Sequence, residues 1–496
     1  MTHAKRETEA EIENIVEIVP QTLYFTVVKA CSPKRRLKTN ADFFFFTIDE
    51  ELTYQNYYYD FGPLNISCLY KYCMKLNKYL QYVKGMKSVV HYTSNHPDKK
   101  ANAAFLIGCY CPFRPFLDAS QLPCQFTLKL FDCLNAIAKA VAFNFFNFDD
   151  FNCSEYDLYD KLEFGDLNWL VPRKFLAFIG PTDNRTSHAP EFYIKYFLKN
   201  DVKTVVRLNN VLYDSYTFLQ VGIQHYDLIF PDGTTPPKEV LIRFLYISET
   251  SPAAIAVHCK AGLGRTGSLI GAYLVKHYRM TAREAIAWLR ICRPGCVIGQ
   301  QQIWLEKIQS WLWRTGSQYR LQHYGEGDKI PRHKYGIYSN IWPAEREKLI
   351  KESRRNIQQQ LSKMQSDNIV QMKQKSKAFS VDKLINDAKN LKSSGDNFKS
   401  VCKLLSPVHC TKRSRDLLSE VKVRKPSKSD KCINCVDPEF ITKRVIKKNS
   451  KKNMDPHRTT PQPQSHHQKL INSSQGDKLN EIKQRNQKIL PTQQKK

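Results

Sequence analysis

The stretch that decides the fold covers residues 253–267 and reads AAIAVHCKAGLGRTG. Its first five residues are apolar, which predicts a buried strand. Residues 268–278 follow with apolar side chains at helical spacing, so the order is strand, glycine-rich loop and helix. Strand and helix patterns alternate through the surrounding sequence as well. This alternation predicts an α/β sheet that carries its site at the carboxyl ends of the strands.

The loop of this stretch has the properties of an anion site. Unpaired backbone N–H groups gather where a loop enters a helix, and the helix dipole adds positive charge there. Glycines at two positions would let the backbone approach a ligand closely. The loop residues predicted to bind a phosphate group are Lys260, Ala261, Gly262, Leu263, Gly264 and Thr266.

Two side chains in this stretch supply chemistry. The positive field at the helix start would stabilise the thiolate of Cys259 and make it a nucleophile. Arg265 lies six residues later and could grip two phosphoryl oxygens at once. Thr266 could donate a hydrogen bond to the sulfur when it leaves. His258 precedes the turn, so we expect it to orient the loop rather than to act as a base.

A cysteine and an arginine at this spacing can also be a buried thiol beside a surface guanidinium. The coincidence of strand, His-Cys pair, loop glycines, Arg-Thr-Gly and helix favours the functional interpretation. A nucleotide-binding P-loop is excluded, because the Gly-Lys-Ser/Thr ending of that motif is missing.

Attack on a phosphate ester requires a proton donor for the leaving oxygen. Asp232 is the candidate, because it lies upstream of the nucleophile and follows the apolar segment 228–230. Asp and Gly form turns readily, so Asp232-Gly233 could also be a plain turn.

Beyond these motifs, the chain closely resembles the cell-division-cycle-fourteen dual-specificity phosphatases, the mitotic-exit family. The resemblance spans about residues 20–320 and supports Cys259 as nucleophile, Arg265 as phosphate-binding arginine and Asp232 as general acid. Besides 258–267, the stretches that carry it include 48–52 (IDEEL), 60–65 (DFGPLN), 165–169 (GDLNW), 174–178 (KFLAF), 206–209 (VRLN), 276–281 (KHYRMT), 290–295 (RICRPG) and 297–299 (VIG).

The resemblance implies a hydrolase that removes phosphate from serine, threonine and tyrosine through a phosphocysteine intermediate. It also implies a preference for phosphoserine followed by proline, with a basic residue downstream, as in substrates of proline-directed kinases. Reversal of cyclin-dependent-kinase phosphorylation in mitotic exit, cytokinesis, or cilium and centrosome control would follow. Gln301 and Gln302 match the glutamines that position the hydrolytic water in that family.

An acidic segment over residues 155–166 resembles the family's substrate groove and linker. By charge pattern alone it would be a solvated helix face. Its location, just ahead of the catalytic residues in a strongly basic chain, favours the groove. The residues that the resemblance assigns to it are Asp157, Asp160, Glu163 and Asp166.

We predict two tandem dual-specificity-phosphatase-like α/β domains, of which the first is catalytically silent. Residues 88–93 (SVVHYT) repeat the strand that ends at Cys259, but Tyr92 takes the place of the nucleophile. Chance similarity is the alternative on pattern alone. Compared with the family, about twenty residues are missing near 109–115. The predicted parts are a flexible N-terminus (1–20), the silent domain (21–147), an acidic linker helix (148–166), the catalytic domain (167–316) and a disordered basic tail (317–496).

Composition bounds the partners and the compartment. The formal net charge is +29, from 76 Lys and Arg against 47 Asp and Glu. Such an excess makes contact of the tail with nucleic acid or microtubules conceivable. The basic clusters at 412–415 and 443–452 could be signals for nuclear import factors, or an ordinary solvated tail. We therefore expect the nucleus, including the nucleolus, the cytoplasm, and the centrosome or spindle.

Other classes of partner are not expected. The sequence has no apolar run long enough to span a bilayer, so membrane insertion is not predicted. No cofactor or metal is expected, since the CxxC at 432–435 lacks a second pair. An alternative interpretation is a phosphopeptide-binding scaffold, inactive because the first domain is shortened. The presence of Cys259, Arg265 and Asp232 argues against it.

Overall fold

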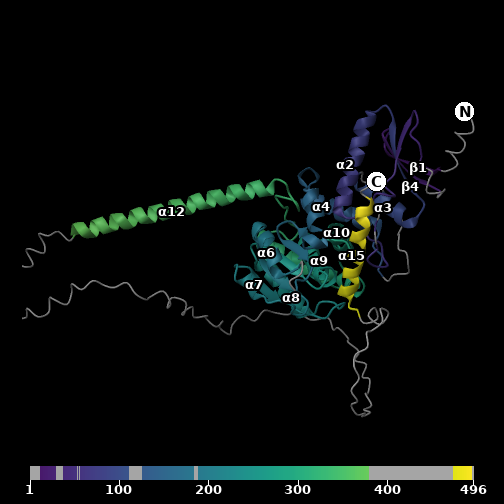
Figure 1. The fold of residues 1–496 in the computed structure, drawn as a ribbon. Helices are drawn as coiled ribbons and strands as arrows, with labels where there is room; N and C mark the ends of the chain where they lie inside the picture. Colours follow the sequence, from purple (N-terminus) through teal and green to yellow (C-terminus); the bar gives the residue numbers. More distant parts are fainter. Residues whose placement is uncertain are drawn as a thin grey trace, which may run out of the picture. The chain divides into compact units, whose positions relative to one another are not determined.

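The computed structural model describes residues 12–29, 37–52, 54, 56–110, 126–183, 188–378 and 473–493. Within them the chain builds two sheets, each accompanied by helices (Figure 1). Both sheets belong to one compact unit, which also contains the described residues 473–493. A second unit contains residues 351–378, which are most of the long helix α12 (Trp342–Ala378).

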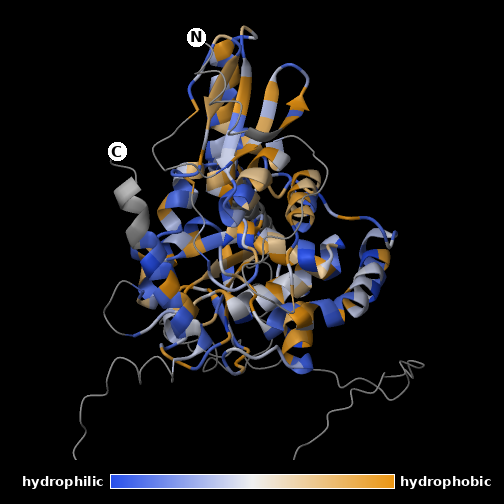
Figure 2. Ribbon diagram, turned by 90° about the vertical axis from the view of Figure 1, so that its right-hand side faces the viewer, coloured by the Kyte–Doolittle hydropathy of each residue, from blue (hydrophilic) through white to orange (hydrophobic). Residues whose placement is uncertain are grey.

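The first domain is a four-stranded sheet in the order β1-β2-β4-β3. Strand β4 pairs in parallel with β2 and β3, and β1 pairs with β2 in antiparallel fashion. Its strands carry many of the orange residues at the top of Figure 2. Helices α2 and α3 pack against β4, and α4 packs against α3. The elements are β1 (Ile12–Val19), β2 (Leu23–Val28), β3 (Phe43–Phe46), β4 (Ser88–Ser94), α2 (Ile66–Val83), α3 (Pro97–Tyr110) and α4 (Leu130–Ala142).

Strand β1 corrects the predicted flexible N-terminus over residues 1–20. Its sequence IENIVEIV is rich in Ile and Val, which favour strands. It satisfies its backbone groups along β2, with Val16 opposite Phe25. Residues 1–11 lie outside the described part of the chain.

The second domain is a five-stranded sheet in the order β5-β6-β9-β7-β8. Strand β9 lies in the middle, between β6 and β7, and all pairs are parallel except β5 with β6. The central strand, β9, therefore leads directly into Cys259. The strands are β5 (Leu167–Val171), β6 (Phe175–Phe178), β7 (Val202–Arg207), β8 (Gln224–Asp227) and β9 (Ala254–His258).

Helix α9 is buried over its whole length, because other helices pack around it. Gly316 of α11 makes this packing close: a Cβ there would lie 1.9 Å from the carbonyl oxygen of Lys276. The helices of this domain are α6 (Pro190–Lys199), α7 (Tyr216–Leu219), α8 (Lys238–Thr250), α9 (Gly264–Tyr278), α10 (Ala282–Cys292) and α11 (Gln300–Tyr324).

The predicted acidic linker helix over 148–166 is three short pieces: η1 (Phe148–Asp150), α5 (Cys153–Tyr159) and η2 (Leu162–Phe164). Asn152 caps α5 by accepting a hydrogen bond from the Glu155 N–H at 3.0 Å. Tyr156 is fully buried and its hydroxyl donates to the carbonyl of Cys292 at 2.9 Å, which ties this segment to α10.

The structured part extends beyond the predicted boundary at residue 317. Helix α11 continues to Tyr324, and Ile337 and Tyr338 are buried against the core. A last helix, α15 (Gln475–Gln493), packs on the second domain through Leu479. Each of these segments has apolar side chains to bury, which a purely solvated tail lacks. The basic clusters, the CxxC and the shortened segment from residue 111 onward lie outside the described residues.

Candidate active site

The phosphate-binding loop is wedged against the end of β6 by two glycines. Gly262 has a φ of +66°, and a Cβ there would lie 2.0 Å from the carbonyl oxygen of Phe178. A Cβ on Gly180 would lie 2.2 Å from the carbonyl oxygen of Cys259. Gly180 also donates its N–H to the carbonyl of Lys260 at 3.1 Å. Only a residue without a side chain fits at these two positions, so the loop can lie this close to β6.

Arg293 holds the phosphate-binding loop through hydrogen bonds to its backbone. It donates to the carbonyls of Gly262 at 2.9 Å and Ala261 at 3.1 Å. Its guanidinium also pairs with both carboxylate oxygens of Asp166, at 2.8 and 3.0 Å. Both side chains are fully buried. Burial opposes the charge of Arg293, but Asp166 outweighs it and raises the arginine's pKa. The buried ion pair between Arg293 and Asp166 therefore fixes the position of the phosphate-binding loop.

His258 holds the loop from the strand side. Its Nδ1 lies 3.2 Å from the carbonyl oxygen of Cys259, and its Nε2 lies 2.8 Å from the hydroxyl of Tyr213. Burial lowers the pKa of His258 to about 3. The imidazole is therefore neutral at pH 7, and it orients the loop without taking a proton from Cys259.

Arg265 and Asp232 meet beside this loop. Arg265 donates to the carbonyls of Phe230 at 2.9 Å and Leu208 at 3.2 Å, and its Nη2 lies 3.2 Å from Oδ1 of Asp232. The Arg265 side chain is only 4% exposed, so these contacts fix its orientation. Cys259, Arg265 and Asp232 come from the end of β9, α9 and the loop after β8, and they converge at the carboxyl end of the sheet.

The two glutamines of α11 point to different partners. Gln301 donates to the carbonyl of Thr234 at 3.2 Å, which places it beside the loop that carries Asp232. Gln302 donates to Oδ2 of Asp60 at 2.6 Å. The same oxygen accepts a hydrogen bond from Arg290 at 2.7 Å. The structure thus brings Gln301 to the site and commits the amide of Gln302 to a contact between the two domains.

The four predicted groove residues have different partners. Asp157 pairs with Lys71 of α2 at 2.6 Å. Asp160 accepts a hydrogen bond from Asn168 at 3.1 Å, and Glu163 is exposed. Asp166 contacts Arg293, which holds the phosphate-binding loop, and it also contacts Lys483. Among the four, Asp166 is therefore the one closest to the chemistry.

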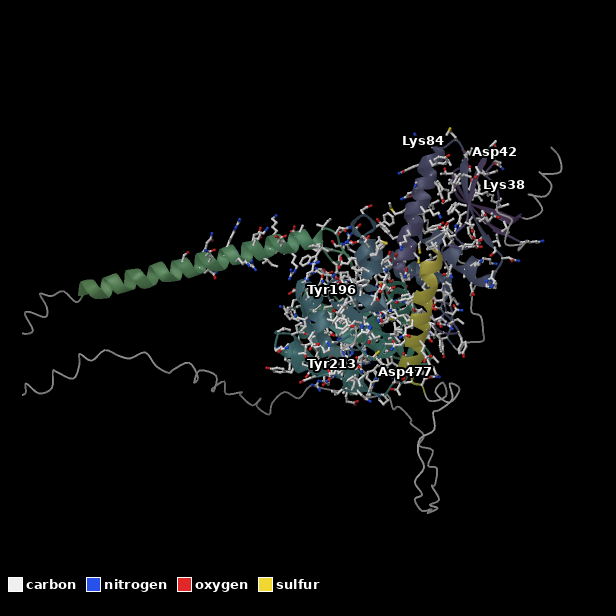
Figure 3. All side chains as sticks on the ribbon, in the orientation of Figure 1. Lys38, Asp42, Lys84, Tyr196, Tyr213 and Asp477 are labelled. Atoms are coloured by element: carbon white, nitrogen blue, oxygen red, sulfur yellow. The ribbon has the colours of Figure 1, made fainter. Side chains whose placement is uncertain are left out.

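Helix α15 contributes contacts that the sequence interpretation missed. The N–H of Gly476 donates to Oδ2 of Asp232 at 2.8 Å. Asp477, which is labelled in Figure 3, forms an ion pair with Lys260 at 2.5 Å. One local signal was available: Ser474 and Asp477 form a reciprocal helix cap, the Ser-x-x-acid pattern. That pattern marks a helix start, but it does not say where the helix docks.

The arrangement suits phosphoryl transfer to sulfur. The thiol of Cys259 precedes a helix start, the guanidinium of Arg265 is paired with the carboxylate of Asp232, and the amide of Gln301 binds the loop that carries Asp232. Among the described residues, no cluster of His, Cys, Asp and Glu could hold a metal ion. The described helices also include none long and apolar enough to cross a bilayer.

Comparisons with known proteins agree with this geometry. Residues 17–112 match the family described as "Dual specificity protein phosphatase, N-terminal half", and residues 179–279 match "Polymorphic toxin system, DSP-PTPase phosphatase". These two matches confirm the predicted tandem of phosphatase-like α/β domains.

Individual relatives point to the same family. The chain is 47% identical over 318 residues to mouse dual specificity protein phosphatase CDC14B, covering 59% of this chain and 66% of the relative. It is 46% identical over 318 residues to human CDC14C, covering 59% of this chain and 71% of the relative. It spans 55% of mouse CDC14A. The overlap with solved structures is slight: a crystal structure of Tk-PTP in the active form matches 29% of this chain and 96% of its own, with 24% identity and a TM-score of 0.26.

Proposed function

The chain belongs to the CDC14 family of dual specificity protein phosphatases, and we propose that it hydrolyses phosphoserine, phosphothreonine and phosphotyrosine in proteins. The observation that carries this proposal is the meeting of Arg265 and Asp232, 3.2 Å apart, beside the loop that starts at Cys259. An arginine that binds phosphoryl oxygens and a carboxylate that protonates the leaving group are both needed within reach of one nucleophile.

In the first step, the sulfur of Cys259 forms a bond to phosphorus, and the bond from phosphorus to the serine, threonine or tyrosine oxygen breaks. Asp232 gives its proton to that oxygen. Arg265 and the loop N–H groups stabilise the charge on the three remaining phosphoryl oxygens. General acid catalysis of this kind contributes about 10²–10⁴-fold in rate.

In the second step, water attacks the phosphocysteine and the sulfur–phosphorus bond breaks. Asp232 now takes a proton from the water. Gln301 is the glutamine whose position supports a role in holding that water, because it lies beside the Asp232 loop. Gln302 was predicted to share this role, and its contact with Asp60 favours an indirect part, through the packing of the two domains.

We extend the proposal to the substrate class and the setting. Substrates are phosphoproteins made by proline-directed kinases, with phosphoserine before proline and a basic residue downstream, and Asp166 is the groove residue that reads the basic side chain. Reversal of cyclin-dependent-kinase phosphorylation in cell-cycle control follows from that class. The basic tail supports import into the nucleus, alongside the cytoplasm and the centrosome or spindle.

The test is a set of paired phosphopeptides with the purified chain. A peptide with pSer-Pro and lysine at the third following position should be hydrolysed faster than pSer-Ala or pTyr peptides. Cys259→Ser should abolish turnover and retain peptide binding. Cys68→Ser is the matched control: burial raises the pKa of Cys68 to about 12, so its thiol is not a nucleophile. Full activity of Cys259→Ser would refute the mechanism.

A second candidate function is a phosphopeptide-binding scaffold. Binding of the pSer-Pro peptide by the wild-type chain without release of phosphate would indicate this scaffold function. Activity without preference among the peptides would instead mean that the reaction stands and the groove assignment fails.

A further inference from the structure

Helix α15 presents one face to the second domain. Its buried residues are spaced by three or four, which places them on a single side of the helix. These residues are Gly476, Leu479, Lys483 and Asn486. Lys478 and Arg485, on other faces of the same helix, are exposed. The helix, drawn in yellow in Figure 1, is therefore docked along one face, as a bound peptide would be.

The start of α15 engages the catalytic groups themselves. Gly476 donates its N–H to Asp232 at 2.8 Å, and Asp477 pairs with Lys260 of the phosphate-binding loop at 2.5 Å. Gln475 accepts a hydrogen bond from Gln301 at 3.3 Å. A Cβ on Gly264 would lie 2.9 Å from Oε1 of Gln475. A phosphorylated side chain and this helix start compete for the same space.

The middle of α15 engages the acidic segment. Lys483 is 3% exposed and its ammonium contacts the buried carboxylate of Asp166. One turn further, Gln487 donates to the carbonyl of Asp160 at 2.9 Å and accepts from the Leu162 N–H at 3.0 Å. Leu479, 2% exposed, fills the space between the two sets of contacts.

The distance between these two contact sets matches the proposed substrate. From Gly476 to Lys483 the helix advances seven residues, which is about 10.5 Å at the helical rise. An extended peptide covers about 10 Å in three residues. Along the helix, the residue that contacts Asp232 and the residue that contacts Asp166 are therefore about as far apart as a phosphorylated residue and the third residue after it in an extended peptide.

We propose that α15 is an intramolecular ligand of the substrate cleft, in which Lys483 occupies the place of the substrate's basic side chain. This inference rests on the proposed function and adds its regulation. A phosphopeptide must displace the helix before it can reach Cys259. If nine chains in ten hold the helix docked, the apparent affinity for substrate falls about tenfold.

The experiment uses full-length variants in the Cys259→Ser background and measures binding of a labelled pSer-Pro-x-Lys peptide by fluorescence anisotropy. Leu479→Asp and Lys483→Ala should each tighten peptide binding. The gain is about tenfold if nine chains in ten of the parent protein hold the helix docked. Arg485→Ala removes a positive charge from an exposed position of the same helix and serves as the matched control. It should leave affinity unchanged.

Hydrogen exchange shows whether each variant has released the helix. The amides of residues 475–487 should exchange faster in Leu479→Asp, while those of β9 keep their protection. Release of the helix without tighter peptide binding would overturn the proposal. So would weaker binding, which would mean that α15 helps to form the cleft.

The same variants with the native cysteine restored at position 259 separate this inference from the function it rests on. Release of α15 should lower KM and leave kcat nearly unchanged. Turnover by the wild type with equal KM in Leu479→Asp and Arg485→Ala would refute the role of α15 and leave the phosphatase function standing. Absence of turnover in every variant, with tighter binding in the Cys259→Ser series, would refute the function and keep the cleft assignment of α15.

Discussion

Asp232 serves both halves of the proposed reaction, and its contacts show how it is held for the task. One oxygen faces Arg265 at 3.2 Å and accepts from the Gly233 N–H at 3.0 Å. While α15 is docked, the other accepts from Gly476. After α15 is displaced, Arg265 and the Gly233 N–H still orient the carboxylate for the reaction.

Asp232→Asn should slow hydrolysis of a phosphoserine peptide by about 10²–10⁴-fold, because the serine oxygen leaves without a proton. Hydrolysis of p-nitrophenyl phosphate should fall much less, since nitrophenolate is a stable leaving group. Steady-state kcat values for the two substrates measure the difference. The control is Asp214→Asn, at an exposed aspartate. Equal losses on both substrates would rule out a general acid role.

Gln301 and Gln302 are neighbours in sequence with separable predicted effects. Gln302→Ala removes a donor from the buried Asp60 and should lower the free energy of unfolding by about 1–3 kcal/mol. Gln301→Ala should leave stability nearly unchanged and slow breakdown of the phosphocysteine, seen as a burst of product before steady state. Denaturant unfolding and rapid-quench kinetics measure the two effects. A loss of stability in Gln301→Ala together with slow phosphocysteine breakdown in Gln302→Ala would contradict the geometry.

At the scale of elements, close packing of α11 on α9 holds the helix that follows the phosphate-binding loop. Gly316→Ala would place a methyl group 1.9 Å from the Lys276 carbonyl oxygen, so the helices must separate. We expect a loss of about 1–3 kcal/mol in unfolding free energy. Gln318→Ala, at an exposed position of the same helix, is the control and should be neutral. Equal stability of the two variants, measured by thermal unfolding, would show that α11 packs less closely on α9 than the structure indicates.

Elements with a strong local pattern could be predicted from the sequence. The run before Cys259 and the helix after it hold the positions expected, as β9 and α9. Strand β1 was missed because it lies in a largely polar N-terminal segment and its own polar residues, Glu13, Asn14 and Glu17, do not alternate. Only its pairing with β2 shows it to be a strand. Asp166 could be singled out by resemblance, but its burial under the loop depends on Arg293, which is distant in sequence. The docking of α15 could not be foreseen, because it depends on tertiary contacts alone.

At the scale of the molecule, the two domains are joined by buried polar contacts as well as by apolar packing. Asp60 of the first domain binds Arg290 and Gln302 of the second. Breaking such a buried pair by removing one partner typically costs about 3–5 kcal/mol. The first domain is therefore part of the structural support of the second.

Buried histidines should make the whole molecule sensitive to acid. Burial lowers the pKa of His91 to about 3, against 6.5 in an unfolded chain. Below pH 6.5 the unfolded state binds a proton that the folded state excludes, so stability is lost as the pH falls. From pH 6.5 to 5.0 this amounts to about 2 kcal/mol for this group.

His91→Phe should remove that part of the pH dependence, although it costs stability at neutral pH because the Tyr72 hydroxyl loses its contact with the imidazole. Urea unfolding at pH 6.5 and 5.0 measures the change. His96→Ala, at an exposed histidine, is the control. A variant that loses as much stability on acidification as the wild type would contradict the assignment.

The helix that docks at Asp232 belongs to the same polypeptide as the cleft, and residues 379–472 connect it to α12. A tethered ligand has a local concentration set by the chain and not by the amount of protein in solution. Dilution of the enzyme therefore leaves the occupancy of the cleft by α15 unchanged. A single cut anywhere in the connecting stretch converts it into an ordinary dissociable peptide, whose occupancy falls with dilution.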